Sequence, residues 1–564
     1  MSWMKRSSKH AIAFALVGAF LSLEASALRA DSLAVGNADP DNWSQYHRTW
    51  NAWRYSPLAQ INAGNVKRLK VAWLHQAGDI TNGLLSTPLV ENGVMYYIAP
   101  NNNVFALDAT NGKTIWHYQP KLNPIANESF YAFQSRNITL GKDYVYVGTL
   151  DGRVVAVDKK TGNEVWSTQL TDLKTCYGCL FSSTPMLAGN VLIGGTTGGD
   201  QPIAGRIFGV DATTGKLLWT LRTTKDDPKS WPGDTWKVGG SAAWNVGTYD
   251  PETDTAYIGV GNAAPDFFYN DRHGDNLYAA TLLALDPKTG SIKWHRQEIP
   301  GDHYDYDSTY EAVVIDDGKR EDIVHLNKSG FVFVMNKANG KLVNVWPMVK
   351  HYNFAKTIDP KTGALIGQVL DYPEDKETTV CPYLLGERSW NPGAYNPKTR
   401  LWYNNAMEVC EVLKPARQDV SKIGIAGLYL GVEKLEAVPP PGEAASARLE
   451  ARDPLTGKLV WEVPYALPGL GGVLTTGGDL VFNGDPEGLV HAYNAGTGKE
   501  LWSFQTGSGI RAGIISYAVN GRQYIAVPSG WGSLAPGFMA SVFPQAAKIP
   551  GGATMVVFTL DSEK

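Results

Sequence analysis

The segment ALDATNGKTIW, residues 106–116, recurs along the chain and decides the fold. Its pattern is Ala or Gly, Asp or Asn two positions later, then Gly and finally Trp. The other clear copies end at Trp166, Trp219, Trp294, Trp461 and Trp502. In each copy an alternating strand ends at the Asp or Asn, a turn follows whose Gly is free to adopt a positive φ, and the next strand carries the Trp. Each copy therefore predicts a β-hairpin.

Two fainter copies extend the pattern. The segment VMNKANGKLV, residues 334–343, lacks the tryptophan, and AYNPKTRLWY, residues 394–403, is weaker still. The clear copies at the start follow one another at about 50 residues, with further short strands between them, which indicates units of four strands. We therefore expect an all-β fold, an eight-bladed β-propeller in which the repeated tryptophans are docking motifs between blades. A β-sandwich with chance similarity between its turns is the alternative.

Other parts of the chain refine this expectation. Residues 346–452 break the period and predict an insertion-rich later blade. The C-terminal segment MVVFTLDSEK, residues 555–564, alternates like a strand, and we expect it to pair with N-terminal residues and close the ring. Four cysteines also occur, and their spacing favours a local pair between Cys176 and Cys179, which leaves Cys381 with Cys410.

The N-terminus has the layout of an export signal. A basic start is followed by an apolar run over residues 11–23 and by the small residues Ala27 and Ala30. We expect a signal peptide over residues 1–30, cleaved near Ala27 or Ala30, and a single periplasmic domain over residues 31–564. The apolar run is short for a membrane span, and no later stretch is long and apolar enough to be one.

Composition and motifs exclude several classes of function. The formal net charge of −4 provides no basic surface of the kind that nucleic-acid-binding proteins carry. No Gly-rich phosphate loop joins a strand to a helix, which argues against a nicotinamide enzyme. No GxSxG motif occurs either, which removes the usual hydrolase.

An acidic cluster is the first candidate for chemistry. The segment PGDHYDYDSTY, residues 300–310, contains Asp302, Asp305 and Asp307. Asp305 and Asp307 are two residues apart, so on extended backbone they point to one side and repel each other without a cation. A solvated polar turn is the plain alternative to a metal or catalytic role.

The repeats, together with WRYSPLAQINAGNVKRLKVAW at residues 53–73, resemble the quinoprotein alcohol dehydrogenases over essentially the whole mature chain. The resemblance implies oxidation of an alcohol with pyrroloquinoline quinone (PQQ) held over a metal ion. It implies that Asp305 is the general base. The metal ligands that it implies are Asp200, Asn262, Asp305 and Asp307.

Two of these ligands bear on the identity of the metal. Asp307 resembles the extra carboxylate of lanthanide-using members, whereas many calcium-using members have a small residue there. A trivalent ion requires more negative charge than calcium does, so Ca²⁺ and a lanthanide both remain open. Asp200 stands where the family has a Glu, and its shorter side chain requires a close approach of the backbone, which Gly198 and Gly199 permit.

The resemblance also implies a set of cofactor contacts. Trp244 matches the tryptophan beneath the quinone ring, Arg136 and Thr149 match residues that bind its carboxylates, and Lys328 matches the partner of its reactive carbonyl. The expected cofactor-binding residues are Arg136, Thr149, Thr197, Gly198, Gly199, Trp244, Lys328, Ser389, Trp531 and Gly532.

Departures from the family predict the substrate. Phe130 and Tyr131 stand where the family has a disulfide between adjacent cysteines, and Leu85, Ala242 and Ser389 replace a Glu, a Thr and an Asn. We expect weaker cofactor binding and a roomier, more apolar pocket. This favours a bulky or secondary alcohol, such as a sugar alcohol, a terpenoid or a trichothecene-like polycycle, oxidised to a ketone or aldehyde.

The sequence also bears on the electron acceptor and on an alternative function. The motif CYGC at residues 176–179 is followed by Leu180 rather than His, so it is no haem-attachment site, and the electrons require a separate acceptor such as cytochrome c. The alternative function is a non-catalytic periplasmic propeller that acts as a scaffold. Such a scaffold has no need for side chains at places that match the family's site, namely Asp305, Asn262, Trp244, Arg136 and Lys328.

Overall fold

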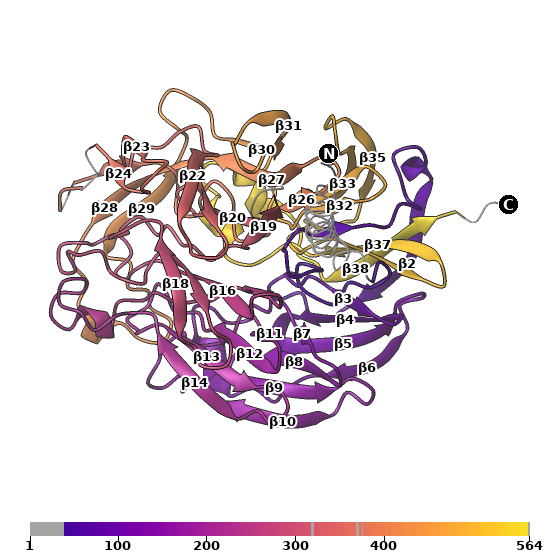
Figure 1. The fold of residues 1–564 in the computed structure, drawn as a ribbon, viewed down its shortest axis with the longest axis horizontal. Coiled ribbons are helices and arrows are strands. Elements are labelled where there is room, and N and C mark those ends of the chain that lie inside the picture. The colour runs from indigo at the N-terminus through magenta and orange to yellow at the C-terminus, as the bar shows by residue number, and fades with distance from the viewer. Residues whose placement is uncertain (1–38, 317–320, 368–371, 375, 562–564) are drawn as a thin grey trace, which may run out of the picture.

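The computed structural model describes residues 39–316, 321–367, 372–374 and 376–561, and Figure 1 shows their arrangement. Eight sheets of four or five strands follow one another around a ring, in the order of the chain (Figure 1). This arrangement confirms an all-β fold of the propeller type. The expected signal peptide lies outside the described residues. Within the described ranges, no helix is long and apolar enough to cross a membrane.

Each of the first five sheets is an antiparallel meander of four consecutive strands. The first two contain β3 (Leu89–Glu91), β4 (Val94–Ala99), β5 (Asn103–Asp108) and β6 (Thr114–Tyr118), then β7 (Thr139–Leu140), β8 (Tyr144–Gly148), β9 (Arg153–Asp158) and β10 (Glu164–Gln169). The next two contain β11 (Met186–Ala188), β12 (Val191–Gly195), β13 (Arg206–Asp211) and β14 (Leu217–Arg222), then β15 (Thr248–Asp250), β16 (Thr255–Val260), β17 (Thr281–Leu285) and β18 (Ile292–Gln297). The fifth contains β19 (Val313–Asp316), β20 (Glu321–Leu326), β21 (Phe331–Asn336) and β22 (Leu342–Pro347).

The last three sheets depart from the simple meander. The sixth contains β26 (Ala394–Asn396), β27 (Leu401–Glu408), β30 (Ser446–Arg452) and β31 (Leu459–Tyr465). The seventh contains β32 (Leu474–Thr476), β33 (Leu480–Gly484), β34 (Leu489–Asn494) and β35 (Glu500–Gln505), with β1 (Tyr55–Ser56) parallel to β32. The eighth contains β36 (Ile515–Val519), β37 (Arg522–Ser529), β38 (Thr554–Leu560) and β2 (Leu69–Gln76). Because β38 pairs with β2, the expected closure of the ring is confirmed.

The remaining elements lie in connections between these strands. Two small sheets contain β23 (Thr357–Ile358) with β24 (Leu365–Ile366), and β25 (Thr378–Val380) with β28 (Cys410–Pro415) and β29 (Val432–Val438). Short helices are η1 (Val66–Arg68), η2 (Pro100–Asn102), η3 (Pro124–Glu128), η4 (Thr235–Lys237), η5 (Val420–Lys422), α2 (Ala535–Phe538) and η6 (Pro544–Lys548). The small sheets confirm an insertion in residues 346–452. Both expected disulfides form, Cys176 with Cys179 and Cys381 with Cys410.

The repeated segment forms the outer hairpin of its sheet. In the first copy, Asp108 Oδ1 accepts a hydrogen bond of 2.8 Å from the backbone N–H of Thr110, and Gly112 has a φ of 74°. In seven of the eight sheets a tryptophan lies against the turn glycine of the next sheet. A Cβ built on that glycine would lie no more than 2.8 Å from an indole atom for the pairs Trp73/Gly112, Trp116/Gly162, Trp166/Gly215, Trp219/Gly290, Trp294/Gly340, Trp346/Gly457 and Trp461/Gly498. Glycine at this place is therefore required by the contact as well as by the turn.

The two fainter copies form different parts of their sheets. The segment 334–343 forms the β21–β22 hairpin, and its strand carries Trp346, two residues beyond the expected place. A strand tolerates this shift because alternate residues share a face. The segment 394–403 forms the β26–β27 hairpin, which is the first pair of its sheet rather than the outer hairpin, so it is no copy of the repeat.

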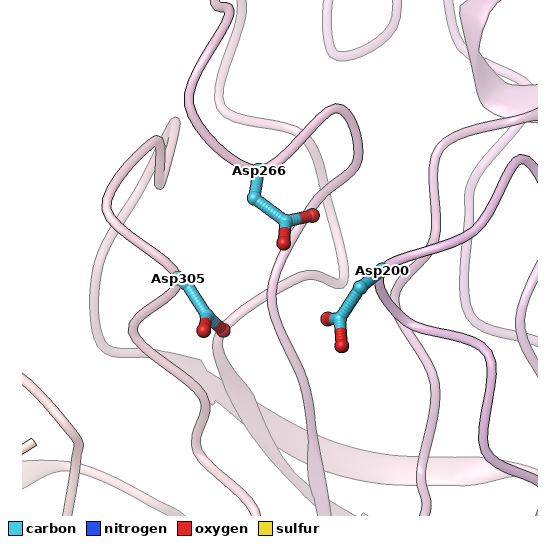
Figure 2. A group of neighbouring side chains, drawn as sticks. All are labelled: Asp200, Asp266 and Asp305. Atoms are coloured by element: carbon cyan, nitrogen blue, oxygen red, sulfur yellow. The ribbon is translucent and has the colours of Figure 1, made fainter. Parts of the chain in front are cut away.

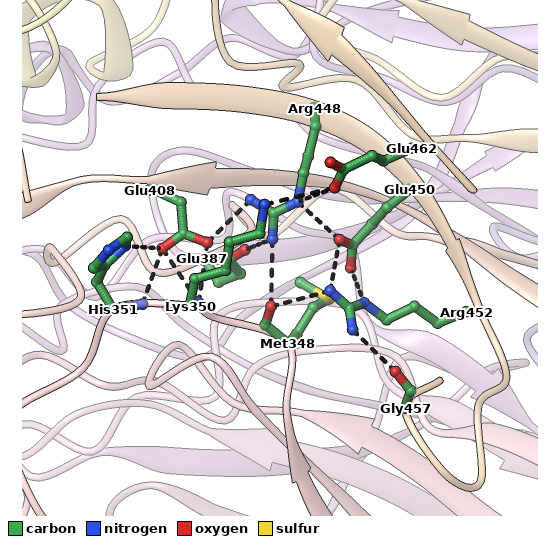
Figure 3. Close-up of polar contacts among 10 residues, drawn as sticks. All are labelled: Met348, Lys350, His351, Glu387, Glu408, Arg448, Glu450, Arg452, Gly457 and Glu462. Carbon is green, nitrogen blue, oxygen red and sulfur yellow. Dashed lines mark hydrogen bonds and ion pairs between the residues drawn. The ribbon is translucent and has the colours of Figure 1, made fainter. Parts of the chain in front are cut away.

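A buried ion network holds the connection into the sixth sheet (Figure 3). Arg448 of β30 donates to Glu450 at 2.8 Å, to Glu408 of β27 at 3.0 Å and to Glu387 at 2.6 Å. Burial opposes the charge of Arg448, but the carboxylates of Glu387, Glu450 and Glu408 outweigh burial and raise its pKa. Since Glu387 precedes β26, the network fixes the segment 384–390 against the strands of the sheet.

Substitution of Gly162 by alanine tests the contact between sheets. Gly162 has a φ of 73° and a Cβ there would lie 2.8 Å from Trp116 Cγ, whereas Gly521 has a φ of 74° and no atom within 4 Å of its Cβ position. Gly521→Ala therefore costs backbone strain alone, about 1–2 kcal/mol, and Gly162→Ala adds an overpacking cost of about 1–3 kcal/mol. We expect a larger fall in thermal midpoint for Gly162→Ala. Equal falls would show that the indole contact contributes nothing.

Candidate active site

A single cavity gathers most of the residues singled out from the sequence. It encloses about 1030 Å³ of empty space, its open mouth included. Its polar lining residues lie in two kinds of connection: Arg136, Trp244 and Asp305 precede the first strand of a sheet, whereas Asp200 and Lys328 follow the second. Because the ring brings these connections of successive sheets together, residues distant in sequence meet in one place.

Three aspartates point toward one another in this cavity (Figure 2). Asp200, Asp266 and Asp305 each offer a carboxylate oxygen, and these oxygens lie within 4.8 Å of one another. Asp200 Oδ2 accepts a hydrogen bond of 2.6 Å from the Tyr131 hydroxyl, and Asp266 Oδ1 accepts one of 2.9 Å from Asn262 Nδ2. Buried carboxylates this close repel one another, and their oxygens are the ligands that a hard cation prefers.

Lys328 supplies an ammonium group to the same cluster. Its Nζ lies 2.8 Å from Asp305 Oδ1 and 2.7 Å from Asp307 Oδ2. Burial opposes the charge of Lys328, but Asp305 and Asp307 outweigh burial and raise the pKa of the ammonium well above its usual value. Burial also raises the pKa of Asp305, an effect that Lys328 opposes and that Asp307 and Asp200 reinforce. The ammonium group of Lys328 thus pairs with both Asp305 and Asp307 at the edge of the acidic cluster.

The turn that carries Asp305 is held in an unusual conformation. Asp305 has a φ of 61°, in the left-handed region that few residues other than glycine and asparagine adopt readily. Asp302 Oδ1 accepts hydrogen bonds of 3.2 Å from the backbone N–H groups of Tyr304 and Tyr306. Burial raises the pKa of Asp302 to about 6, although Arg272 opposes this shift. Asp302 therefore organises the turn, while Asp305 points into the cavity.

Buried polar groups fix the residues on the other side of Asp305. Glu298 accepts a hydrogen bond of 2.6 Å from Ser308 Oγ and lies 2.8 Å from His325 Nδ1. Asn327 Nδ2 donates to the carbonyl oxygen of Asp307 at 3.1 Å. Burial of charged or polar groups is favourable only when they are paired in this way, so these contacts fix the position of the connection between β18 and β19.

A further ion pair joins the connection between β18 and β19 to the connection that precedes β26. Arg388 donates from both terminal nitrogens to Glu311, at 2.9 and 2.6 Å, and both side chains are buried. The bidentate geometry fixes the orientation of both groups. It places Ser389 and Tyr310, the neighbours of these residues in the chain, in the lining of the same cavity.

Asn262 stands behind the acidic cluster rather than in the cavity lining. It follows β16, and its backbone N–H donates to Asp307 Oδ1 at 2.8 Å. A Cβ at Gly261 would collide with that oxygen, so the preceding residue must be glycine. Asn262 therefore bridges Asp307 and Asp266 through its backbone and its side chain.

Arg136 lies over two aromatic rings in the cavity. Its guanidinium carbon is 4.8 Å from the ring centroid of Trp244 and 5.1 Å from that of Trp390. It donates hydrogen bonds to Ser182 and Gln134. Burial lowers the pKa of Arg136 to about 10. A fixed cation beside a flat indole surface is suited to an anionic planar molecule.

The structure brings most, but not all, of the residues expected from the sequence into the cavity. The lining includes Arg136, Thr197, Gly198, Gly199, Asp200, Trp244, Asp305, Asp307, Lys328 and Ser389. Thr149 is buried outside it and donates to Asp151 at 2.6 Å, and Trp531 donates to the carbonyl oxygen of Ala546 at 2.9 Å. Gly532 contributes a carbonyl oxygen that accepts from Arg511 at 3.0 Å.

The lining residues that were not singled out from the sequence include Asp266, Trp390 and Arg511. Asp266 lies four positions after Asn262 in the loop that leaves β16, and a carboxylate so close to an expected ligand was a usable signal. Arg511 is an isolated charge in the apolar stretch GIRAGII, which also could have been noticed. Trp390 follows Ser389 directly, but nothing in its local pattern distinguishes it from a packing residue.

The mouth of the cavity is largely apolar. Phe130 and Tyr131 line it with ring centroids 5.3 Å apart, at the place where the sequence suggested an aromatic pair. The insertion contributes to it, because Tyr429 N–H donates to the Asp200 carbonyl at 2.8 Å and Phe267 N–H donates to the Leu430 carbonyl at 2.8 Å. The aliphatic and aromatic residues around the mouth include Leu384, Leu385, Leu428, Leu430, Leu435 and Phe538.

Comparison with known proteins gives this geometry a context. Residues 43–358 and 443–525 match the family described as glucose/ethanol/alcohol dehydrogenase, beta-propeller domain. The quinoprotein alcohol dehydrogenase PedH of Pseudomonas putida is 35% identical over 90% of this chain and 89% of its own length.

Solved structures agree with the family match. The quinohemoprotein alcohol dehydrogenase ADHIIG from Pseudomonas putida HK5 has a TM-score of 0.86 and 32% identity, over 94% of this chain and 82% of that chain. A europium-containing methanol dehydrogenase has a TM-score of 0.84 and 28% identity, over 94% of this chain and 99% of that chain. With the acidic cluster and the indole floor in one cavity, these matches show that the chain belongs to the PQQ-dependent alcohol dehydrogenases.

Proposed function

We propose that the protein oxidises a bulky, apolar, mainly secondary alcohol to its ketone, with PQQ and a hard cation bound in the cavity. The observation that carries the proposal is the direct continuity of an apolar mouth with the acidic cluster around Asp305. An alcohol can therefore place its carbon skeleton among the leucines and its hydroxyl group at the carboxylates. The europium-containing methanol dehydrogenase supports a lanthanide as the ion, with Ca²⁺ as the alternative.

The residues present fit both bound groups. Three carboxylate oxygens within 4.8 Å of one another form a donor set for a hard cation, and Asp307 and the amide of Asn262 adjoin it. We assign the cation to Asp200, Asn262, Asp305 and Asp307, and Asp266 is close enough to add an oxygen ligand. The planar cofactor fits the ring face of Trp244, beside Arg136 and Lys328. When bound, the quinone accepts the electron pair of the alcohol and the cation polarises its carbonyl group.

Within this arrangement, the side chains handle the proton and the orientation of the substrate. A carboxylate oxygen of Asp305 takes the hydroxyl proton, since it faces the cavity from a turn that Asp302 fixes. Lys328 is 2.8 Å from Asp305 and holds its carboxylate in position. The mouth residues exclude water from the reacting hydroxyl group.

Apolar contacts decide among the expected substrate classes. Leu384, Leu428, Leu430 and Leu435 lie within the insertion, and Phe538 lies in α2. These side chains offer no hydrogen bonds to the hydroxyl groups of a sugar alcohol. They favour a terpenoid or polycyclic alcohol instead, although each methylene-scale contact contributes only about 1–3 kcal/mol to discrimination.

The proposed function also requires export of the chain and an acceptor for the electrons. We infer that residues 1–30 direct export, that residues 31–564 form one domain in the periplasm, and that the electrons pass to a separate acceptor such as cytochrome c. No nucleic acid takes part. We also infer that the eight sheets correspond to eight blades and that the contacts of tryptophan with glycine are their docking motifs.

Replacement of Asp305 by asparagine tests the base. Asparagine tolerates the left-handed backbone at this residue, where φ is 61°, so Asp305→Asn preserves the turn. We expect PQQ-dependent alcohol oxidation to fall by far more than tenfold, which corresponds to about 1.4 kcal/mol in the barrier. The circular dichroism spectrum and the thermal midpoint serve as controls. Retention of more than about a tenth of the rate would assign the proton to another group.

Replacement of Asp307 by asparagine tests the metal. Asp307→Asn keeps an acceptor for the Asn262 N–H and removes one charge, so lanthanide affinity is expected to fall more than calcium affinity, by about tenfold or more. Terbium luminescence sensitised by tryptophan, and competition with Ca²⁺, measure both affinities without turnover. Asp286→Asn, at a surface turn of the repeat, is the matched control. Equal losses for the two ions would contradict a role for Asp307 in lanthanide selection.

A substrate panel tests the mouth. Values of kcat/KM are compared for methanol, ethanol, 2-butanol, sorbitol and a polycyclic secondary alcohol, and we expect the polycyclic alcohol to be the best substrate. Leu428→Asn is expected to lower kcat/KM for that alcohol by about tenfold and to leave ethanol nearly unchanged. Leu218→Asn, whose side chain is exposed on β14, is the control. Methanol or ethanol as the best substrate would refute the proposed class.

A further inference from the structure

Arg511 is a second buried arginine in the cavity. It lies between β35 and β36 in an otherwise apolar stretch, is 1% exposed, and lines the same space as Arg136 and Trp390. A guanidinium group at this depth has lost its water, which is unfavourable unless its charge and its N–H groups are matched by partners. A buried arginine such as Arg511 therefore needs partners for both its charge and its N–H groups.

Arg54 shows what a satisfied buried arginine looks like in this fold. Arg54 is 0% exposed, and its three nitrogens donate to the carbonyl oxygens of Val473, Tyr46 and Ile514 at 2.8, 2.9 and 2.8 Å. Each side-chain nitrogen of Arg54 thus donates to a backbone carbonyl oxygen, and Arg54 connects its own segment to two segments that are distant in sequence. Its role is structural.

Arg511 is not satisfied in this way. Its side chain donates one hydrogen bond, from Nη1 to the Gly532 carbonyl at 3.0 Å, and Nε has no partner. Its other contact is with the face of Trp531, whose centroid lies 5.9 Å from the guanidinium carbon. In the part of the chain that the structure describes, no carboxylate forms an ion pair with Arg511.

The charged group that acts on the pKa of Arg511 is Arg136, which is also a cation. Burial, with a smaller contribution from the positive charge of Arg136, lowers the pKa of Arg511 to about 9, so the group still carries its charge at neutral pH. Nε of Arg136 also lacks a hydrogen-bond partner. On the acidic side, Lys328 pairs with Asp305 and Asp307. Two guanidinium groups therefore face one cavity without an anion between them, which indicates that a bound ligand provides it.

We propose that Arg511 binds a carboxylate of the quinone cofactor and acts with Arg136 as a two-armed anion clamp. The inference rests on the proposed function, because PQQ is the anion that the family implies. Arg511 then supplies a contact that offsets the polar groups replaced by Leu85, Ala242 and Ser389. A carboxylate of an acidic substrate has the same chemistry, so the test is made without substrate.

The test measures cofactor affinity and stability of the cofactor-free protein in one variant. PQQ is titrated into Arg511→Met with Ca²⁺ present and no alcohol, and binding is followed by quenching of tryptophan fluorescence. We expect the Kd for PQQ to rise by about tenfold or more relative to wild type. The thermal midpoint of the cofactor-free protein is expected to stay the same or to rise, because an unmatched buried charge has been removed. Arg511→Lys is expected to give an intermediate Kd.

Arg54→Met is the matched control, and its cofactor-free thermal midpoint is expected to fall because three carbonyl oxygens lose their donor. A lower midpoint for Arg511→Met with unchanged PQQ affinity would make Arg511 structural and overturn the inference. Unchanged PQQ affinity with a higher KM for an acidic alcohol would overturn it in favour of substrate binding. If wild type itself binds no PQQ, the proposed function fails and the inference fails with it.

Discussion

An indole ring resting on the bare backbone of a glycine in the next sheet is the contact on which the rest of this structure depends. Trp116 and Gly162 show it most simply, since the turn and the ring leave no room for a Cβ. Each such contact sets the position of one sheet against its neighbour. The connections at the inner strands then converge in a fixed geometry, although they share no sequence pattern. The repeat thus builds the ring, and the irregular connections inside it build the site.

Burial of charge is the second constraint. In a medium of low dielectric constant, unpaired charges are costly and paired ones define orientation. Arg388 with Glu311, and Arg448 with Glu387, fix the segment before β26 through such pairs. The carboxylates of Asp200, Asp266 and Asp305 are left close together instead. Lys328 pairs with Asp305, but among the described residues no side chain forms an ion pair with Asp200 or Asp266. The site therefore differs from its supports in having more carboxylates than cations, which favours the binding of a hard cation.

These two constraints explain which features could be predicted. The hairpins were predictable because Asp108 and Gly112 give a local signal that any turn of this type requires. The inner position of the β26–β27 hairpin was not, because local pattern does not tell the first pair of a sheet from the last. The resemblance placed Asp305, Lys328 and Trp244 in one cavity, whereas Asp266 and Arg511 enter it through the convergence of loops that no local pattern records. Thr149 and Trp531 match the family equally well and lie outside the lining.

Closure of the ring has a temporal consequence. Leu69 at the start of β2 lies opposite Leu560 at the end of β38, so one sheet needs both ends of the chain. During synthesis the earlier sheets can form in order, but the eighth waits until nearly all residues have left the ribosome. Arg511 lies just before the first strand of that sheet, and the loop after β37, which contributes Ser533, Leu534 and Ala535 to the cavity lining, lies between two of its strands. A chain still being made therefore has no complete binding site, and the capacity to bind cofactor is itself a report that folding has finished.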